Sequence, residues 1–146
     1  MEKWKNFALA FGVAVLWVII MHELYMLLYP PTFPSLPPPV ITSYSFLRFL
    51  QIFVWGCVFA PVIEDVIFRW TPINLMESLK WSKDSILYGV IITSALFGWY
   101  HAMDYYHIII QGVVGVILSW LYIKNKSLLM NILFHTVYNF YFIFLV

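Results

Sequence analysis

Five long apolar runs follow one another along this chain, at about residues 4–28, 44–70, 82–102, 106–123 and 127–146. A helix needs about 20 residues to cross the hydrocarbon core of a membrane, and each run is close to that length. We therefore expect five membrane-spanning helices joined by short connections.

The composition agrees with a protein that lives in a membrane. Of its 146 residues, 63% are hydrophobic and 10% are charged, whereas about a quarter of the residues of a soluble domain are charged. The predicted fold class is an all-α, polytopic membrane helix bundle, and the bilayer is its first expected partner. A net charge of +1 gives no reason to expect nucleic acid as a partner. The single cysteine, Cys57, excludes an intrachain disulfide.

Prolines mark the one internal boundary of the sequence. Six of the eight prolines lie within residues 29–43, and proline lacks the N–H group that a helix needs. We therefore expect a linker there, between a first span at 4–28 and a four-helix core at 44–146. Together these parts form a single membrane domain over residues 1–146.

Four further residues predict how the core helices bend and pack. Pro61 is expected to kink the second span, and Pro72 is expected to end that span or bend it again. The polar stretch 74–84 then connects the second and third spans. Gly112 and Gly115 lie in the fourth span, where small residues let two helix backbones approach closely.

Basic residues indicate the orientation in the membrane. If the spans alternate in direction, all the lysines outside them fall on one side, which the positive-inside rule assigns to the cytoplasm. We therefore expect a cytoplasmic N-terminus and a C-terminus outside, in a multi-pass protein of a prokaryotic cell membrane. These lysines are Lys3, Lys5, Lys80, Lys83, Lys124 and Lys126.

Polar side chains recur inside three of the apolar runs. An ionisable group deep in a bilayer costs about 3 kcal/mol or more, so it usually faces a cavity and serves a function. A carboxylate pair, an arginine, two imidazoles and a carboxamide on three helices predict a buried catalytic site. The three strings are Glu64-Asp65-x-x-x-Arg69, Phe97-x-x-x-His101 and His135-x-x-x-Asn139.

The depth of these groups depends on the connection between the second and third spans. The midpoint between Glu64 and His101 lies within that connection. If the second helix continues past Pro72, the two side chains reach similar depth. If a long loop replaces it, His101 lies about 10 Å deeper, at about 1.5 Å per helical residue.

Residue spacing suggests a role for each group. Asp65 and Arg69 are four residues apart and can pair on one helix face, which leaves Glu64 free to act as a general base on water. His135 and Asn139 share a face and could donate hydrogen bonds to an oxyanion. Because no serine lies beside either histidine, direct attack by water fits better than an acyl-enzyme.

The three motifs, in this order, resemble those of the CPBP family, over residues 58–141. That family includes type II CAAX prenyl endopeptidases and bacterial proteins linked to bacteriocin processing, self-immunity and abortive infection. Its pattern is Glu-Glu-x-x-x-Arg, then Phe-x-x-x-His, then His-x-x-x-Asn or Asp. The second glutamate of the pattern is Asp65 here, which is one methylene shorter.

The resemblance implies an intramembrane endopeptidase and assigns a role to each matching residue. Glu64 corresponds to the catalytic base, and His101 to the residue that positions or polarises water. His135 and Asn139 correspond to the groups at the oxyanion. Arg69 is a structural partner, and Phe97 could form a wall of the pocket. The implied partner is a peptide or membrane-protein substrate, and the mechanism needs no cofactor.

Two other interpretations stay open. Glu64, His101 and His135 are also possible zinc ligands, which would make the protein a metal-dependent hydrolase. Alternatively, the chain is a non-catalytic scaffold or immunity-type subunit, with a partner subunit or a second copy of itself. The remaining polar residues fit structural roles: His22 and Glu23 at the membrane interface, and Asp104 and His107 in solvent.

Overall fold

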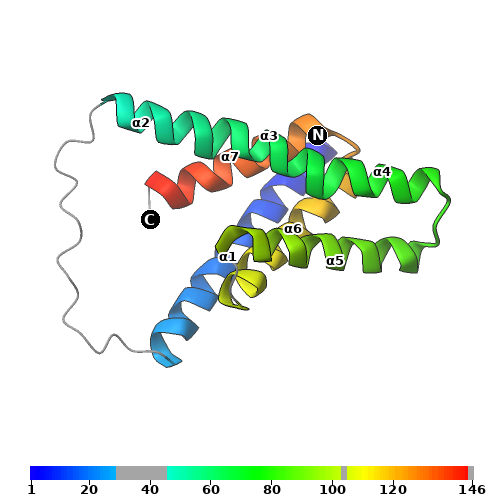
Figure 1. Cartoon of the computed structure of the whole chain (residues 1–146), viewed down its shortest axis with the longest axis horizontal. Helices are drawn as coiled ribbons and strands as arrows, with labels where there is room; N and C mark the ends of the chain where they lie inside the picture. Colours follow the sequence, from blue (N-terminus) through cyan, green and yellow to red (C-terminus); the bar gives the residue numbers. More distant parts are fainter. Residues whose placement is uncertain (29–45, 103–104, 145–146) are drawn as a thin grey trace.

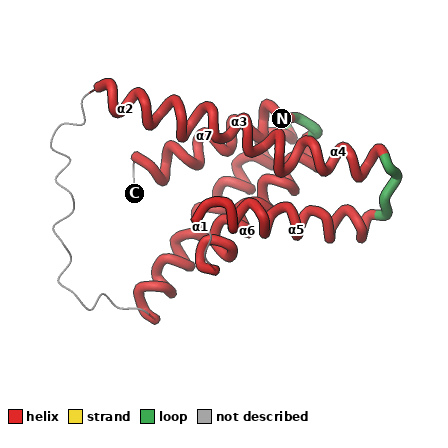
Figure 2. Tube along the Cα trace, viewed as in Figure 1, coloured by secondary structure: helices red, strands yellow, loops and turns green. Residues whose placement is uncertain are grey.

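The computed structural model describes residues 1–28, 46–102 and 105–144, without the side chains of residues 102 and 105–107. The predicted linker at 29–43, Asp104 and the side chain of His107 lie outside these residues. The described chain is built from helices and contains no strand (Figure 2).

Five continuous helices make up the described chain (Figure 1). Three helical stretches are long and apolar enough to cross a membrane, and α7 is a shorter apolar helix. α5 has the length of a span but includes Lys83, Asp84 and His101. The predicted all-α membrane bundle is confirmed. The helices are α1 (Glu2–Leu28), a long second helix (Phe46–Ser78), α5 (Lys83–Ala102), α6 (Tyr105–Asn125) and α7 (Leu128–Phe144).

The second helix alternates between α-helical and wider π-helical turns. Its segments, in order, are α2 (Phe46–Ile52), η1 (Phe53–Phe59), α3 (Ala60–Asp65), η2 (Val66–Trp70) and α4 (Thr71–Ser78). A proline lies two residues after each π-helical segment, Pro61 after η1 and Pro72 after η2. A proline ring clashes with the carbonyl of the preceding turn, and a wider turn makes room for it.

This helix is longer than the sequence predicted, because it continues through Pro72 to Ser78 instead of ending near Trp70. Tertiary packing explains the difference. Ile73 and Met76 are buried against Val90 and Tyr122, and the amide of Asn74 donates to the hydroxyl of Tyr122 at 2.7 Å. The polar residues at 74–78 therefore belong to a helix with one buried face.

A tight turn follows α4 and leads into α5. The N–H of Lys80 donates to Glu77, and the N–H of Trp81 donates to Met76, which closes the helix end with two hydrogen bonds. Lys80 has a φ of 55°, the left-handed conformation that such a helix end requires. Because the helix is continuous and the turn is short, the condition for Glu64 and His101 to lie at similar depth is met.

Close packing between α5 and α6 depends on small residues, as predicted. A Cβ atom at Gly115 would lie 3.1 Å from the Cβ of Ser94 and 3.2 Å from its Cα, and one at Gly112 would lie 3.4 Å from the Ser94 carbonyl. Both glycines therefore let α6 approach the backbone of α5.

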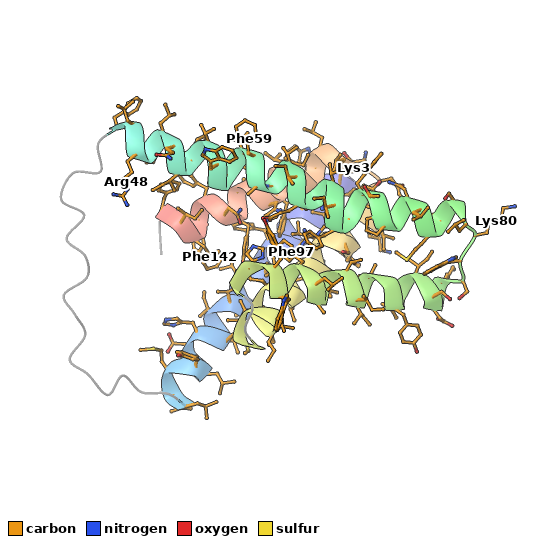
Figure 3. The ribbon with its side chains drawn as sticks, in the orientation of Figure 1. Lys3, Arg48, Phe59, Lys80, Phe97 and Phe142 are labelled. Atoms are coloured by element: carbon orange, nitrogen blue, oxygen red, sulfur yellow. The ribbon has the colours of Figure 1, made fainter. Side chains whose placement is uncertain are left out.

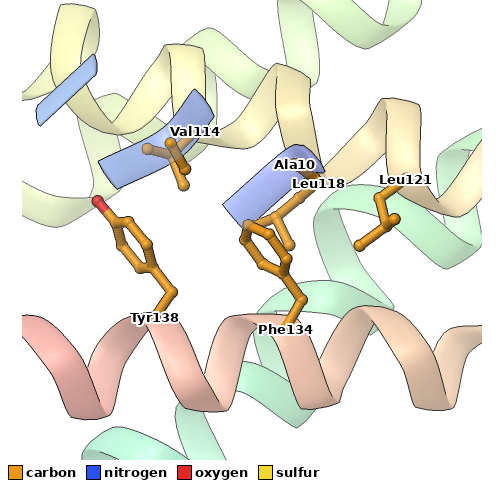
Figure 4. Close-up of a cluster of buried hydrophobic side chains, with 7 residues drawn as sticks. Ala10, Val114, Leu118, Leu121, Phe134 and Tyr138 are labelled. Carbon is orange, nitrogen blue, oxygen red and sulfur yellow. The ribbon is translucent and has the colours of Figure 1, made fainter. Parts of the chain in front are cut away.

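α1 completes the bundle by packing on α6 and α7. In the main buried cluster, Phe134 and Tyr138 of α7 project toward Val114 and Leu118 of α6 and Ala10 of α1 (Figure 4). At one end, the amide of Asn6 donates to Asn125 at 2.9 Å. Lys126 also forms an ion pair with Glu77 at this end, so the basic ends of α1, α4 and α6 are joined.

We predict that Gly115→Ala lowers the melting temperature of the purified protein, because overpacking at a tight contact typically costs about 1–3 kcal/mol. Gly12→Ala is the matched control, since no atom lies within 4 Å of a Cβ placed there. Thermal unfolding of both variants in the same detergent tests this. Equal melting temperatures for the two variants would contradict the role of Gly115.

Candidate active site

The fold brings the three polar strings to one place. Glu64 and Asp65 end α3, Phe97 and His101 lie near the end of α5, and His135 lies in α7. Figure 3 shows Phe97 of α5 beside the long second helix. Lys80 lies at the hairpin end of that helix and Arg48 at the other, so the site is in the interior of the bundle.

His135 lies between the two neighbouring carboxylates. Its Nε2 is 3.4 Å from Glu64 Oε2, and its Nδ1 is 3.3 Å from Asp65 Oδ1. The imidazole is 1% exposed, and Glu64 is 9% exposed. Adjacent residues of a helix point about 100° apart, yet one ring contacts both because its two nitrogens lie on different edges. Glu64 is therefore paired with His135, which the sequence spacing did not reveal.

Asp65 also pairs with Arg69, as the four-residue spacing predicted. The Arg69 Nη1 lies 3.5 Å from Asp65 Oδ1, and both side chains are buried. The guanidinium carbon lies 3.7 Å from the centre of the Phe97 ring, in a cation–π contact. Asp65 Oδ1 thus faces both Arg69 and His135. It connects the ion pair within the second helix to α7.

Phe97 connects the two histidines. Its ring centre is 4.4 Å from that of His101 and 5.8 Å from that of His135. Its ring is fully buried, so it lies on the inner side of the cluster.

His101 lies at the exposed rim of the site. Its Nδ1 is 2.8 Å from the carbonyl oxygen of Phe97. A carbonyl only accepts hydrogen bonds, so Nδ1 is the donor, and in the neutral ring Nε2 carries the lone pair. His101 also interacts electrostatically with Glu64, His135 and Arg69. A carboxylate and an imidazole lone pair in one partly open site are groups that can bind and activate water.

Asn139 has a partner outside this cluster. Its Nδ2 donates to the carbonyl oxygen of Gly56 at 2.8 Å. Nearby, the Thr136 hydroxyl donates to the carbonyl oxygen of Cys57 at 2.7 Å. Sequence reasoning did not select Thr136. The signal that could have found it is Pro61, which cannot donate to the carbonyl four residues earlier.

Two other expectations concern the exposed pair in α1 and a possible metal site. His22 and Glu23 are exposed and lie 3.6 Å from each other. Within residues 1–28, 46–102 and 105–144, no group of three histidine, cysteine, aspartate or glutamate side chains is arranged to hold a metal ion.

These features define a multi-pass membrane protein with a buried carboxylate–histidine site. Residues 46–141 match the family model described as type II CAAX prenyl endopeptidase Rce1-like. The match covers well over half of the chain, and the chain therefore belongs to this family.

One curated relative agrees with this assignment. The chain is 28% identical over 90 residues to the Bacillus subtilis (strain 168) protein named "Putative membrane peptidase YdiL". The matched region covers 62% of this chain and 34% of that relative, so the chain spans about a third of its length. No solved structure matches the chain.

We predict that Asp65→Ala destabilises the protein by about 3–5 kcal/mol, because it leaves the buried Arg69 without its counter-charge. The double variant Asp65→Ala/Arg69→Met is expected to recover part of this loss, since it removes both charges together. Thermal unfolding measures the effect, with the exposed Asp84→Ala as a control. Additive losses for Asp65 and Arg69 would contradict the pairing.

Proposed function

We propose that this chain is an intramembrane endopeptidase that hydrolyses a peptide bond of a membrane-associated peptide or protein. The observation that carries the proposal is the nearly buried Glu64 carboxylate, 3.4 Å from His135 Nε2, in a chain of a membrane protease family. Water is the second substrate, and it reaches the interior of a membrane protein only at a polar site. His101 lies at the exposed rim of the site proposed here.

In the proposed mechanism, Glu64 is the general base. His101 Nε2 accepts a hydrogen bond from a water molecule and orients it. The water oxygen attacks the carbonyl carbon of the peptide bond while Glu64 takes the water proton. The protonated Glu64 then gives this proton to the leaving nitrogen, and the C–N bond breaks.

The oxyanion formed by this attack needs hydrogen-bond donors, and His135 is the first candidate. In the free site its Nε2 faces Glu64. Protonation of Glu64 removes the charge that holds this nitrogen, so an Nε2–H becomes available to the oxyanion. Asn139 is the second donor implied by the family pattern, because its amide has one N–H besides the one that donates to Gly56.

A non-catalytic scaffold is the alternative that a specific observation favours. Both nitrogens of His135 already face carboxylate oxygens, and Arg69 faces Asp65. A cluster of such ion pairs can hold helices together in a membrane without catalysing a reaction. The alternatives differ in one outcome: Glu64→Gln, which keeps the size of the side chain, abolishes the biological effect of an enzyme and leaves that of a scaffold intact.

We predict that Glu64→Gln lowers the rate of peptide cleavage by about 10²–10⁴-fold, because the amide cannot accept the water proton. The assay uses protein in nanodiscs and a library of membrane peptides. Glu23→Gln, an exposed carboxylate in α1, is the matched control. Equal cleavage by wild type and Glu64→Gln would contradict the proposal, and loss of cleavage on adding a chelator would indicate a metal-dependent hydrolase instead.

We also propose that the N-terminus lies in the cytoplasm and the C-terminus outside, in a prokaryotic cell membrane. Lys80 and Arg48 lie at opposite ends of the second helix (Figure 3). In a Cys57→Ala background, we predict that a membrane-impermeant maleimide labels Arg48→Cys but not Lys80→Cys in intact cells. Labelling of Lys80→Cys alone would reverse the orientation. Labelling of both after lysis is the control.

A further inference from the structure

Two backbone carbonyls of the second helix bond to side chains of another helix. The Gly56 oxygen accepts from Asn139 Nδ2 at 2.8 Å, and the Cys57 oxygen accepts from the Thr136 hydroxyl at 2.7 Å. Both donors lie on α7, and both acceptors lie in the π-helical segment η1. In an ordinary helix such carbonyls accept from the backbone of the same helix.

Pro61 explains why these carbonyls need outside donors. The N–H of Ala60 donates to Trp55, five residues earlier, and so bypasses Gly56. Residue 61 would donate next, to Gly56 in a π-helical pattern or to Cys57 in an α-helical one. Proline has no N–H and can donate to neither. An unpaired carbonyl in an apolar medium is costly, so a donor from α7 stabilises the wide turn.

The same stretch of α7 also carries His135. The ring of His135 faces Glu64 and Asp65, which lie directly after the wide turn in α3. His135 and Thr136 are adjacent, and Asn139 follows one turn later. The hydrogen bonds at Gly56 and Cys57 therefore fix α7 beside the turn from which the two carboxylates project.

We propose that Thr136 and Asn139 are positioning residues, which form a carbonyl latch with Gly56 and Cys57 and thereby set the separation between His135 and Glu64. The latch itself is independent of any reaction, whereas its effect on turnover rests on the proposed endopeptidase function. For Asn139, this adds a role to the oxyanion role implied by the family pattern. Thr136 occupies an unspecified position of the third motif, directly after His135, and is a new assignment.

Three substitutions test the latch, two of Thr136 and one of Thr93 in α5. Thr136→Val keeps the shape of the side chain but removes the hydroxyl, and Thr136→Ser keeps the hydroxyl. We expect Thr136→Val to lower the melting temperature by several degrees, and Thr136→Ser to restore most of the loss. Thr93→Val is the control, because the Thr93 hydroxyl bonds only Val90 of its own helix among the hydrogen bonds observed.

The variant Pro61→Ala, used as a background for Thr136→Val, tests whether Pro61 is the reason that the second helix needs donors from α7. An alanine at position 61 supplies one N–H, so the second helix can satisfy the Cys57 carbonyl itself in an α-helical pattern. We expect the melting-temperature loss of Thr136→Val to fall to less than half in this background. Equal losses in the two backgrounds would overturn the proposal. If Pro61→Ala does not fold, the comparison of Thr136→Val with Thr136→Ser decides alone, and a serine no better than valine overturns it.

Turnover tests the positioning effect separately. We expect Thr136→Val to lower kcat by about 10- to 100-fold with KM nearly unchanged, since a small misplacement of catalytic groups has effects of this size. Thr136→Ser should restore kcat. A change in KM alone would overturn the positioning role. The melting temperatures need no activity, so a failure of the proposed hydrolysis still leaves the latch itself testable.

Discussion

The structure depends on one constraint: in an apolar medium, backbone polar groups must find their partners within the protein. Continuous helices satisfy most backbone groups in the described residues. Among the exceptions are two carbonyls beside Pro61, those of Gly56 and Cys57, to which Asn139 and Thr136 of α7 donate. Side-chain charges follow the same rule, because Asp65 faces both Arg69 and His135. At each of these places a polar group of the second helix has its partner on α7, so the two helices are joined there.

The charged cluster joins helices of the bundle, and it contains the groups to which the proposed function assigns chemistry. His135 binds α7 to α3 by facing two carboxylates, and Arg69 extends the cluster to the Phe97 ring of α5. Removing a single member leaves a buried charge without its partner, which is far more costly than removing a pair. Catalysis by Glu64 would use a group that also holds the helices together. If Glu64 takes up a proton during a reaction, Asp65 still faces Arg69 and His135, so these buried charges keep a partner.

The position of the site follows from how the helices pack and bend. α3 is a short α-helical segment between two π-helical ones, and Glu64 and Asp65 lie at its end. Wide turns of this kind rotate the residues that follow them, and they often occur at functional sites. Gly112 and Gly115 meanwhile let α6 approach α5 closely, and α5 carries Phe97 and His101. His101 is exposed while Glu64 and His135 are buried, so the polar groups of the site differ in their access to the surroundings.

The sequence by itself determined the class of this protein, because length and hydropathy decide whether a run of residues can cross a membrane. It also predicted the Asp65–Arg69 pair and the close approach at Gly112 and Gly115, since both depend on spacing along one helix or on side-chain size. Tertiary structure decided what depends on a second helix. The helix continues past Pro72 because Ile73 and Met76 are buried against α5 and α6. His135 reaches both carboxylates, and Asn139 bonds to Gly56, because α7 lies beside the wide turn at Pro61. The spacing of residues within one helix carries no information about the distance between that helix and another.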